Sequence, residues 1–520
     1  MKGIYFLKSG KNIRFYSALL LFFGYFIFCW TYKLAVLPGL HGDEAWFGLR
    51  AVETSHSGVT QLTGMTYYTG ILQVLVSVLS FSTSYTGIVP LRAAGVFFNL
   101  LGLMIISITM ISAGYRRALI FFLLFMAQSM LYLSAPRVAW EVNTFTLFFI
   151  SILVFCAQRI LKQGSKFTRL HTGLFLAVNV IGTYNHILFS AISVAMLGGV
   201  VLWSLFFRSS AKNPMLLTLI FNLVNLVFTF LMMRYLLGYF VHLIFIPLTA
   251  ISILIFIELW LIKRIGYLKL VNDLSVKPLF IQGTMALLFV VFTFTHGVSF
   301  FELVSNDKVM MNFYSYRTSL YERMVLLGGG TLMSAYFIIL LGQDFLKTRT
   351  FSLFAFTIVC YLGILPLYTL NCSFRYYLSI IPMMALYLAF RSIQDPKINC
   401  QLVISMLFTA ATLGMGCYRV YSLGDRPVTP VRFVIGNRQS ETSAHFIQKD
   451  PIIRTLRSHK TSKIVYFSDR YFLEQPILFY KIISPWESSQ GNIGTLDFDY
   501  NTGGKGFIFY DPDQLSSSSR

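Results

Sequence analysis

The sequence predicts a mainly α-helical, polytopic membrane protein. Hydrophobic residues make up 56% of the 520 residues and charged residues only 12%, whereas a soluble globular domain carries about 25% charged residues. A chain so poor in charge cannot cover a surface that faces water. Apolar runs also recur along the chain, and many approach the roughly 20 residues that cross a bilayer as a helix. These observations exclude a soluble enzyme, a disordered protein and a fibrous protein.

About thirteen of these apolar runs are predicted to be transmembrane helices. A further apolar run after residue 70 is shorter, and its length suits a helix at the membrane surface or a re-entrant helix better than a span. The predicted spans are 17–37, 86–113, 117–134, 143–161, 170–188, 189–207, 214–233, 240–262, 279–301, 325–342, 351–370, 374–391 and 401–418.

The distribution of Lys and Arg predicts the orientation of these spans. The net charge of +21 first suggests a nucleic-acid partner. With the N-terminus in the cytoplasm, however, the inner segments carry 20 of the 42 basic residues and the outer loops only nine. This asymmetry is the positive-inside bias of membrane proteins. No basic stripe remains for a polyanion, so we expect no nucleic-acid partner, a cytoplasmic N-terminus and a C-terminus on the outer face.

Two regions are expected to form separate units. Residues 1–418 form the transmembrane domain, whose first outer loop (38–85) carries juxtamembrane helices. In residues 419–520 the apolar content falls and turn residues become more frequent. Apolar runs at 463–467 and 506–510 in this tail indicate strands, with a helix between them at 469–481. We therefore predict a small α/β domain outside the cytoplasm.

The strongest candidate site is the sequence His41-Gly42-Asp43-Glu44, directly after the first predicted span. Two adjacent carboxylates lie at the membrane surface there, where a charged side chain is energetically costly and therefore often has a functional role. Asp43 is expected to cap a helix, because Asp is a good N-cap residue and Gly42 eases the preceding turn. Arg50 follows two helical turns later on the same face. The alternative is an ordinary helix cap with solvated charges.

Five more residues near the outer surface are candidates. Arg137 and Glu141 lie in a very short loop, where they either pair with each other or serve a site. Arg375 enters a predicted span from outside, either as a snorkelling side chain or as a contact for an anionic head group. Arg92 lies similarly at the outer end of a span. His186 lies near the outer end of another span, where a lone histidine is more often structural.

Together these segments resemble the GT-C membrane glycosyltransferases. The nearest branch is that of the protein O-mannosyltransferases and the lipid A aminoarabinose transferases. The resemblance is strongest over 15–200 and weakens through 210–300. It rests on the topology and on four segments, HGDEAWFGLRA, PLRAAGVFFNLLG, PRVAWEVNTFTLFF and FRYYLSIIP. It implies a multi-pass protein of the bacterial inner membrane with a periplasmic or extracellular C-terminal domain.

The resemblance also implies a reaction and a division of roles. An acceptor hydroxyl attacks the sugar of a polyprenyl-phosphate donor and inverts the anomeric carbon. The acceptor is an envelope lipid such as lipid A, another glycan or a protein. Asp43 is the expected base. Glu44 and Glu141 either orient the acceptor or join Asp43 in holding a divalent metal. The residues expected to bind the donor and its phosphate are Arg50, Arg92, Arg137, Arg375 and His186.

The chain departs from the family at one position. Many members carry a basic residue and paired prolines where this chain has the sequence from Thr66 to Gly70. No lysine is therefore available there for the carrier phosphate, and the role must fall to Arg50, Arg92 or Arg375.

Two other classes of function remain open. A lipid or solute transporter has a similar number of spans, but it is expected to carry charges in mid-membrane or to show inverted halves. A receptor or assembly factor would depend on its outer domain and not on Asp43.

Overall fold

The computed structural model describes most of two separate parts of the transmembrane region. These are residues 10–66, 69–162 and 168–186 of the first part, and 304–314, 318–346, 353–365 and 374–394 of the second. It also describes scattered positions in 188–199, at 301, in 403–418 and in the tail. The predicted spans at 214–233 and 240–262, and almost all of the one at 279–301, lie outside the described residues.

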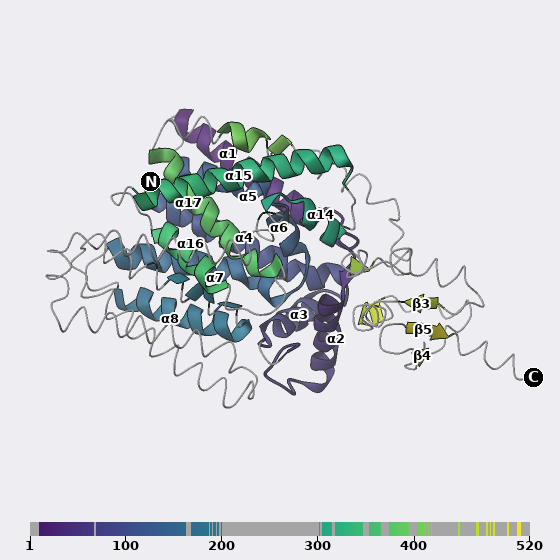
Figure 1. Cartoon of the computed structure of the whole chain (residues 1–520). Helices are drawn as coiled ribbons and strands as arrows, with labels where there is room; N and C mark the ends of the chain where they lie inside the picture. Colours follow the sequence, from purple (N-terminus) through teal and green to yellow (C-terminus); the bar gives the residue numbers. More distant parts are fainter. Residues whose placement is uncertain are drawn as a thin grey trace, which may run out of the picture.

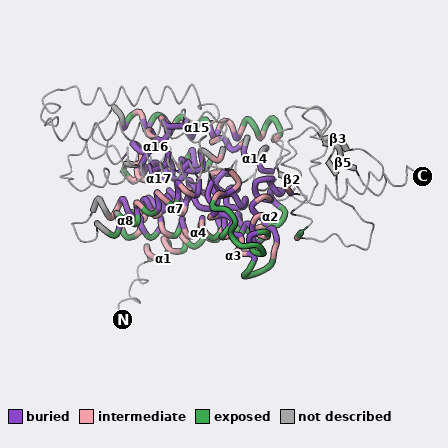
Figure 2. Tube along the Cα trace, turned by 90° about the horizontal axis from the view of Figure 1, so that it is seen from below, coloured by how far each residue is buried: buried purple, intermediate pink, exposed green. Residues whose placement is uncertain are grey.

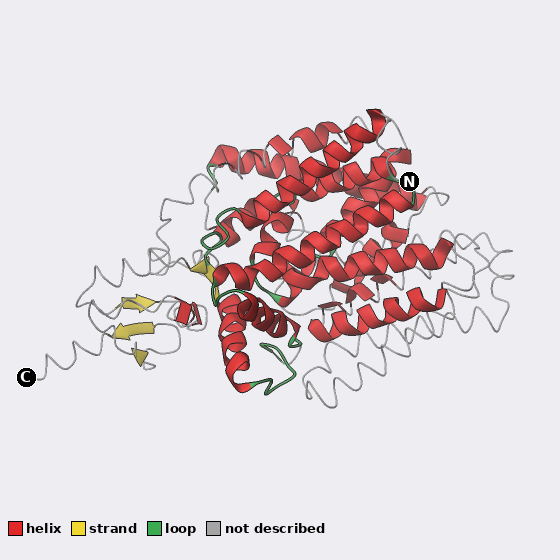
Figure 3. Ribbon diagram, turned by 180° about the vertical axis from the view of Figure 1, so that it is seen from behind, coloured by secondary structure: helices red, strands yellow, loops and turns green. Residues whose placement is uncertain are grey.

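Long helices lie side by side in the first part of the chain (Figure 1, Figure 3). Helix α4 (Ile88–Ser112) packs closely on α7 (Glu141–Lys162): a Cβ added at Gly102 would lie 3.1 Å from the Phe148 backbone nitrogen. Small residues permit such close approaches between membrane helices. The buried Asn99 amide joins the two helices by donating to the Asn143 carbonyl at 2.8 Å. The helices are α1 (Gly10–Thr31), α4 (Ile88–Ser112), α7 (Glu141–Lys162) and α8 (Thr168–Asn185).

The second part of the chain adds three helices to this bundle: α15 (Leu320–Leu346), α16 (Leu353–Ile364) and α17 (Ile380–Gln394). A buried ion pair joins α15 to α17, with Arg391 Nη2 at 2.9 Å from Asp344 Oδ1. The Tyr387 hydroxyl donates to the other carboxylate oxygen at 2.7 Å. Both Asp344 oxygens are therefore satisfied, as a buried charge requires. Figure 2 shows buried residues concentrated in the centre of the bundle, with more exposed positions along α15.

One predicted span is broken. The sequence predicts a single helix at 117–134, but the structure has α5 (Arg116–Gln128) and α6 (Met130–Ser134), with a 77° bend at the break. Ser129 is extended and caps α6, accepting the Tyr132 N–H at 3.3 Å. Asn306 Oδ1 accepts the Met130 N–H at 2.9 Å. These bonds replace the helical bonds that the break removes, which makes it tolerable at membrane depth.

The described residues support a polytopic membrane protein without testing the number of spans. Among them, four helices are long and apolar enough to cross a bilayer, or five if the bent pair counts as one span. The predicted span at 374–391 is shorter as a helix, because a 3-10 turn, η6 (Phe374–Tyr377), precedes α17. The figure of thirteen spans and the placement of the N-terminus in the cytoplasm stay predictions.

The first outer loop and parts of the tail lie at the same end of the bundle (Figure 1, Figure 2). The loop contains β1 (Leu40–His41), α2 (Gly42–Ser57) and α3 (Leu72–Thr83). Strand β1 pairs antiparallel with β2 (Phe446–Ile447) of the tail. The Phe479 ring is fully buried and stacks on Phe81 of α3. A short helix, α14 (Asp307–Tyr314), lies close to both α6 and β2.

The tail also contains the two predicted strands. These are β3 (Ile464–Tyr466) and β5 (Phe507–Tyr510), which pair antiparallel. A further strand that the sequence did not indicate, β4 (Asp497–Phe498), completes a sheet of order β3-β5-β4. Helical positions occur among residues 475–483, within and just beyond the predicted helix. The division of the chain at residue 418 stays a prediction.

Candidate active site

The two adjacent carboxylates lie at the start of α2 and point to different partners. His41, not Asp43, caps this helix: its Nδ1 accepts the Asp43 N–H at 3.0 Å. Glu44 completes a capping box by accepting the His41 N–H at 3.5 Å. The expected N-cap was therefore wrong by two residues, and Asp43 lies in the first helical turn. The positive end of the helix dipole stabilises a carboxylate there.

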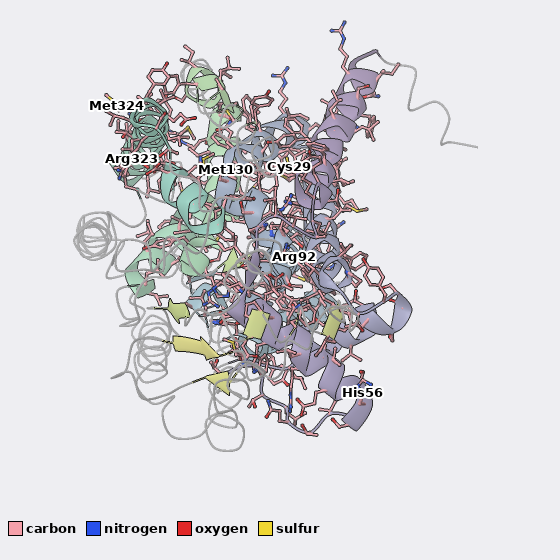
Figure 4. The ribbon with its side chains drawn as sticks, turned by 90° about the vertical axis from the view of Figure 1, so that its right-hand side faces the viewer. Cys29, His56, Arg92, Met130, Arg323 and Met324 are labelled. Carbon is pink, nitrogen blue, oxygen red and sulfur yellow. The ribbon has the colours of Figure 1, made fainter. Side chains whose placement is uncertain are left out.

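Glu44 forms a buried ion pair with Arg92. Both side chains have no exposed surface, and the two bonds from Nε and Nη2 of Arg92 to the carboxylate are 2.7 and 2.8 Å long. The Ala139 N–H also donates to Glu44, at 3.0 Å. The remaining N–H groups of Arg92 donate hydrogen bonds to the carbonyls of Leu34, Pro38 and Gly39. All five of its donors are thus in use, and the pair holds the first outer loop against α4 (Figure 4).

Breaking this pair is expected to destabilise the protein. Arg92→Leu leaves Glu44 as a buried charge without its counter-ion, a change that typically costs about 3–5 kcal/mol. We expect a clear loss of thermal stability in detergent, measured by the temperature at which the purified protein aggregates. Arg50→Leu is the matched control. Its ion pair with Glu53 reaches the surface, and exposed pairs are worth about 0–1 kcal/mol. Equal stability of both variants would contradict a structural role for Arg92.

Arg137 also satisfies backbone carbonyls. Its guanidinium donates to the carbonyls of Cys29 and Tyr32 at the end of α1, and to that of Leu37 at 2.8 Å. The Cys29 carbonyl is one of the orphan acceptors that every helix C-terminus leaves. Arg137 lies in a 3-10 turn, η2 (Ala135–Arg137), that packs beside α4.

The second charge pair of the site contains Asp43 and Arg375. Arg375 lies in the 3-10 turn before α17, and its Nη2 is 3.1 Å from Asp43 Oδ2. The Arg375 guanidinium also lies over the Trp140 ring, 4.4 Å from its centroid. Asp43 is 6% exposed at its side chain and Arg375 is 24% exposed. A carboxylate and a guanidinium therefore meet at an accessible point at the end of the bundle.

Glu141 and His186 lie beside this pair. His186 Nε2 is 3.7 Å from Glu141 Oε1, and both side chains are buried. His186 Nδ1 accepts the Leu188 N–H at 3.0 Å, so the neutral ring carries its proton on Nε2, which faces Glu141. A bridge to Thr69 of the first outer loop fixes the His186 backbone. Glu141 is within electrostatic reach of both Arg375 and Asp43.

One oxygen of Glu141 has no hydrogen-bond partner. Oε2 accepts no hydrogen bond, and water does not replace the missing partner because Glu141 is only 1% exposed. A buried carboxylate oxygen without a donor is costly, and such groups are uncommon away from functional sites. The position of this oxygen beside Asp43 and Arg375 makes it a candidate to accept a hydrogen bond from a substrate hydroxyl.

The three carboxylates do not converge on one cation. Glu44 is bound on both oxygens by Arg92, and Arg375 places a positive charge beside Asp43. Within the described residues, no cluster of three or more His, Cys, Asp or Glu side chains is arranged to hold a metal ion. A divalent metal stays a prediction, and the chemistry below assigns no step to it.

The structure separates the candidates into two groups. It brings together Asp43, Arg375, Glu141 and His186, and it turns Glu44, Arg92 and Arg137 toward structural partners. Arg50 pairs with Glu53 and with the Thr60 hydroxyl, at 2.5 and 2.6 Å. Sequence analysis missed Trp140. The only signal was an aromatic residue next to a charged one at a membrane surface, which is common in membrane proteins.

Comparisons with known proteins identify the fold. No protein-family model and no curated protein matches the chain by sequence. The structure matches the oligosaccharyltransferase of Archaeoglobus fulgidus in complex with Zn and sulfate, at 13% identity and a TM-score of 0.50. The apo form of that protein matches at 13% identity and a TM-score of 0.51. These matches cover 86% of this chain and 56 to 58% of the other, so the chain spans little more than half its length.

A third match covers both chains almost completely. ArnT from Cupriavidus metallidurans, bound to undecaprenyl phosphate, aligns over 95% of this chain and 98% of its own, at 11% identity. Its TM-score of 0.37 is too low to establish a common fold. The chain therefore has the fold of this oligosaccharyltransferase, which is consistent with the predicted resemblance to the GT-C membrane glycosyltransferases.

Proposed function

We propose that this protein is an inverting glycosyltransferase that uses a sugar carried on a polyprenyl monophosphate. The observation that supports this most directly is the Asp43–Arg375 pair, a carboxylate and a guanidinium 3.1 Å apart in a GT-C fold. Glycosyl transfer from a lipid phosphate needs these two groups: a base for the acceptor hydroxyl and a positive charge for the leaving phosphate.

The proposed reaction is a single displacement. The acceptor hydroxyl oxygen forms a bond to the anomeric carbon while the bond from that carbon to the phosphate oxygen breaks. The hydroxyl proton passes to Asp43, and the bonding electrons leave with the phosphate. Arg375 offsets the negative charge that develops there. Attack from the side opposite to the leaving group inverts the anomeric carbon.

Glu141 and His186 are proposed to orient a substrate hydroxyl. The unbonded Oε2 of Glu141 accepts a hydrogen bond from it, and His186 holds the carboxylate in place from the other side. Glu44 is not proposed for this role, because Arg92 and the Ala139 N–H occupy its oxygens. The acceptor is an envelope lipid, glycan or protein on the outer face of the membrane.

A transfer assay tests this proposal. Purified protein in detergent is mixed with synthetic undecaprenyl-phosphate sugars, each labelled in the sugar, and with an extract of bacterial envelopes. We expect label to enter the extract and free undecaprenyl phosphate to accumulate in equal amounts. Absence of both products across pentose, hexose and amino-sugar donors would overturn the proposal and favour a transporter.

A further inference from the structure

Trp140 lies where four segments of the candidate site meet. It directly precedes α7, and its carbonyl accepts the Thr144 N–H at 2.8 Å in the first turn of that helix. The edge of the His41 ring, from β1, meets the Trp140 ring with centroids 4.6 Å apart. Phe313 of α14 lies 6.3 Å away by the same measure. The indole is therefore held on several sides and is only 2% exposed.

The fourth contact of Trp140 is with Arg375. The guanidinium carbon lies over the indole ring, 4.4 Å from its centroid, which is a cation–π contact. The N–H groups of a guanidinium lie in its plane and point away from its edges. The contact with the ring π-system thus leaves N–H groups available for bonds to oxygen atoms. One edge faces Asp43 at 3.1 Å, and about a quarter of the side chain stays exposed.

We propose that Trp140 is a positioning residue that holds the Arg375 guanidinium in place beside Asp43, so that its N–H groups meet the phosphate of the lipid carrier. This inference rests on the proposed function, because the phosphate is that of the proposed donor. An arginine side chain has many rotamers, and fixing it before binding reduces the ordering cost of binding. The rigid indole provides this constraint from the side of its ring, and Asp43 lies 3.1 Å from one guanidinium nitrogen.

The position of Trp140 also links the two halves of the proposed chemistry. Its neighbour Glu141 carries the unbonded oxygen, and its ring contacts His41, which caps the helix that carries Asp43. Movement of the indole would therefore displace Arg375 relative to Asp43. A residue that served only to fill the core would have no specific effect on the carrier phosphate.

The test measures the affinity of the purified protein for undecaprenyl phosphate without a sugar. Trp140→Leu is expected to weaken binding about tenfold, in line with the loss of a desolvated cation–π contact. Trp140→Phe keeps an aromatic face and should bind within about threefold of the wild type. In an Arg375→Ala background, Trp140→Leu should cause no further loss of affinity, because the guanidinium that Trp140 positions is then absent.

Trp30→Leu is the matched control. Trp30 is a fully buried tryptophan that packs on Phe26 and Tyr132, so its loss should lower stability without changing affinity for the carrier. Equal binding by wild type and Trp140→Leu would overturn the inference. So would an equal loss with and without Arg375, which would mark Trp140 as a packing residue. If the wild type itself does not bind undecaprenyl phosphate, the proposed function fails and the inference fails with it.

Discussion

Asp43→Asn is expected to abolish sugar transfer while the protein still folds. An amide nearly matches the size of the carboxylate and still accepts hydrogen bonds, but it cannot take a proton from the acceptor. General-base catalysis typically contributes about 10²–10⁴-fold, so the rate should fall at least about a hundredfold. The measurement is the initial rate of label transfer from an undecaprenyl-phosphate sugar in detergent, after a check that the variant is monodisperse.

The Asp43→Asn result is interpreted with two controls. Glu53→Gln changes an exposed carboxylate on the same helix, and it should transfer sugar at nearly the wild-type rate. Affinity for undecaprenyl phosphate should persist in Asp43→Asn, because Trp140 still holds Arg375. If Asp43→Asn transfers sugar at nearly the wild-type rate, Asp43 is a structural residue and the base must be sought at Glu141.

Arg375→Ala is expected to have the second largest effect. It removes the charge that offsets the leaving phosphate, and loss of one such electrostatic contact commonly costs about 10²–10³-fold in rate. Arg375→Lys should retain more activity, because it keeps the charge but loses the planar fork and the stacking on Trp140. The measurement is kcat/KM for the lipid-linked donor in each variant.

Another arginine serves as the control for Arg375. Arg323 pairs with Asp307 at 3.2 Å, and its side chain is 61% exposed, so Arg323→Ala should leave kcat/KM for the donor nearly unchanged. Donor kinetics that are the same in wild type, Arg375→Ala and Arg375→Lys would remove Arg375 from the site.

The pattern of apolar runs predicted the helices but not their breaks. Runs such as 86–113 and 143–161 correspond closely to α4 and α7. The break at Ser129 was not predictable, because it depends on Asn306, which accepts the Met130 N–H from 176 positions along the chain. A local pattern contains no information on such a distant partner.

The residue types at the site were predictable, but their partners were not. The spacing of Asp43 and Glu44 indicated a charged site after the first span. It did not indicate that Glu44 turns inward to Arg92 while Asp43 meets Arg375, 332 positions away in sequence. Arg92, Arg137 and Arg375 each lie near the end of a predicted span, and it is the Glu44 carboxylate and the backbone carbonyls around the first two that distinguish their roles.

Mass spectrometry of the bacterial envelope tests the proposed glycosyl transfer most directly. Lipids, glycans and proteins are compared from cells that produce the wild type, Asp43→Asn or neither. We expect one envelope component to gain the mass of a single sugar residue only where the wild type is present, with Asp43→Asn matching the cells that lack the protein. Identical envelopes in all three strains, or the same added sugar with Asp43→Asn as with the wild type, would contradict transfer by this site.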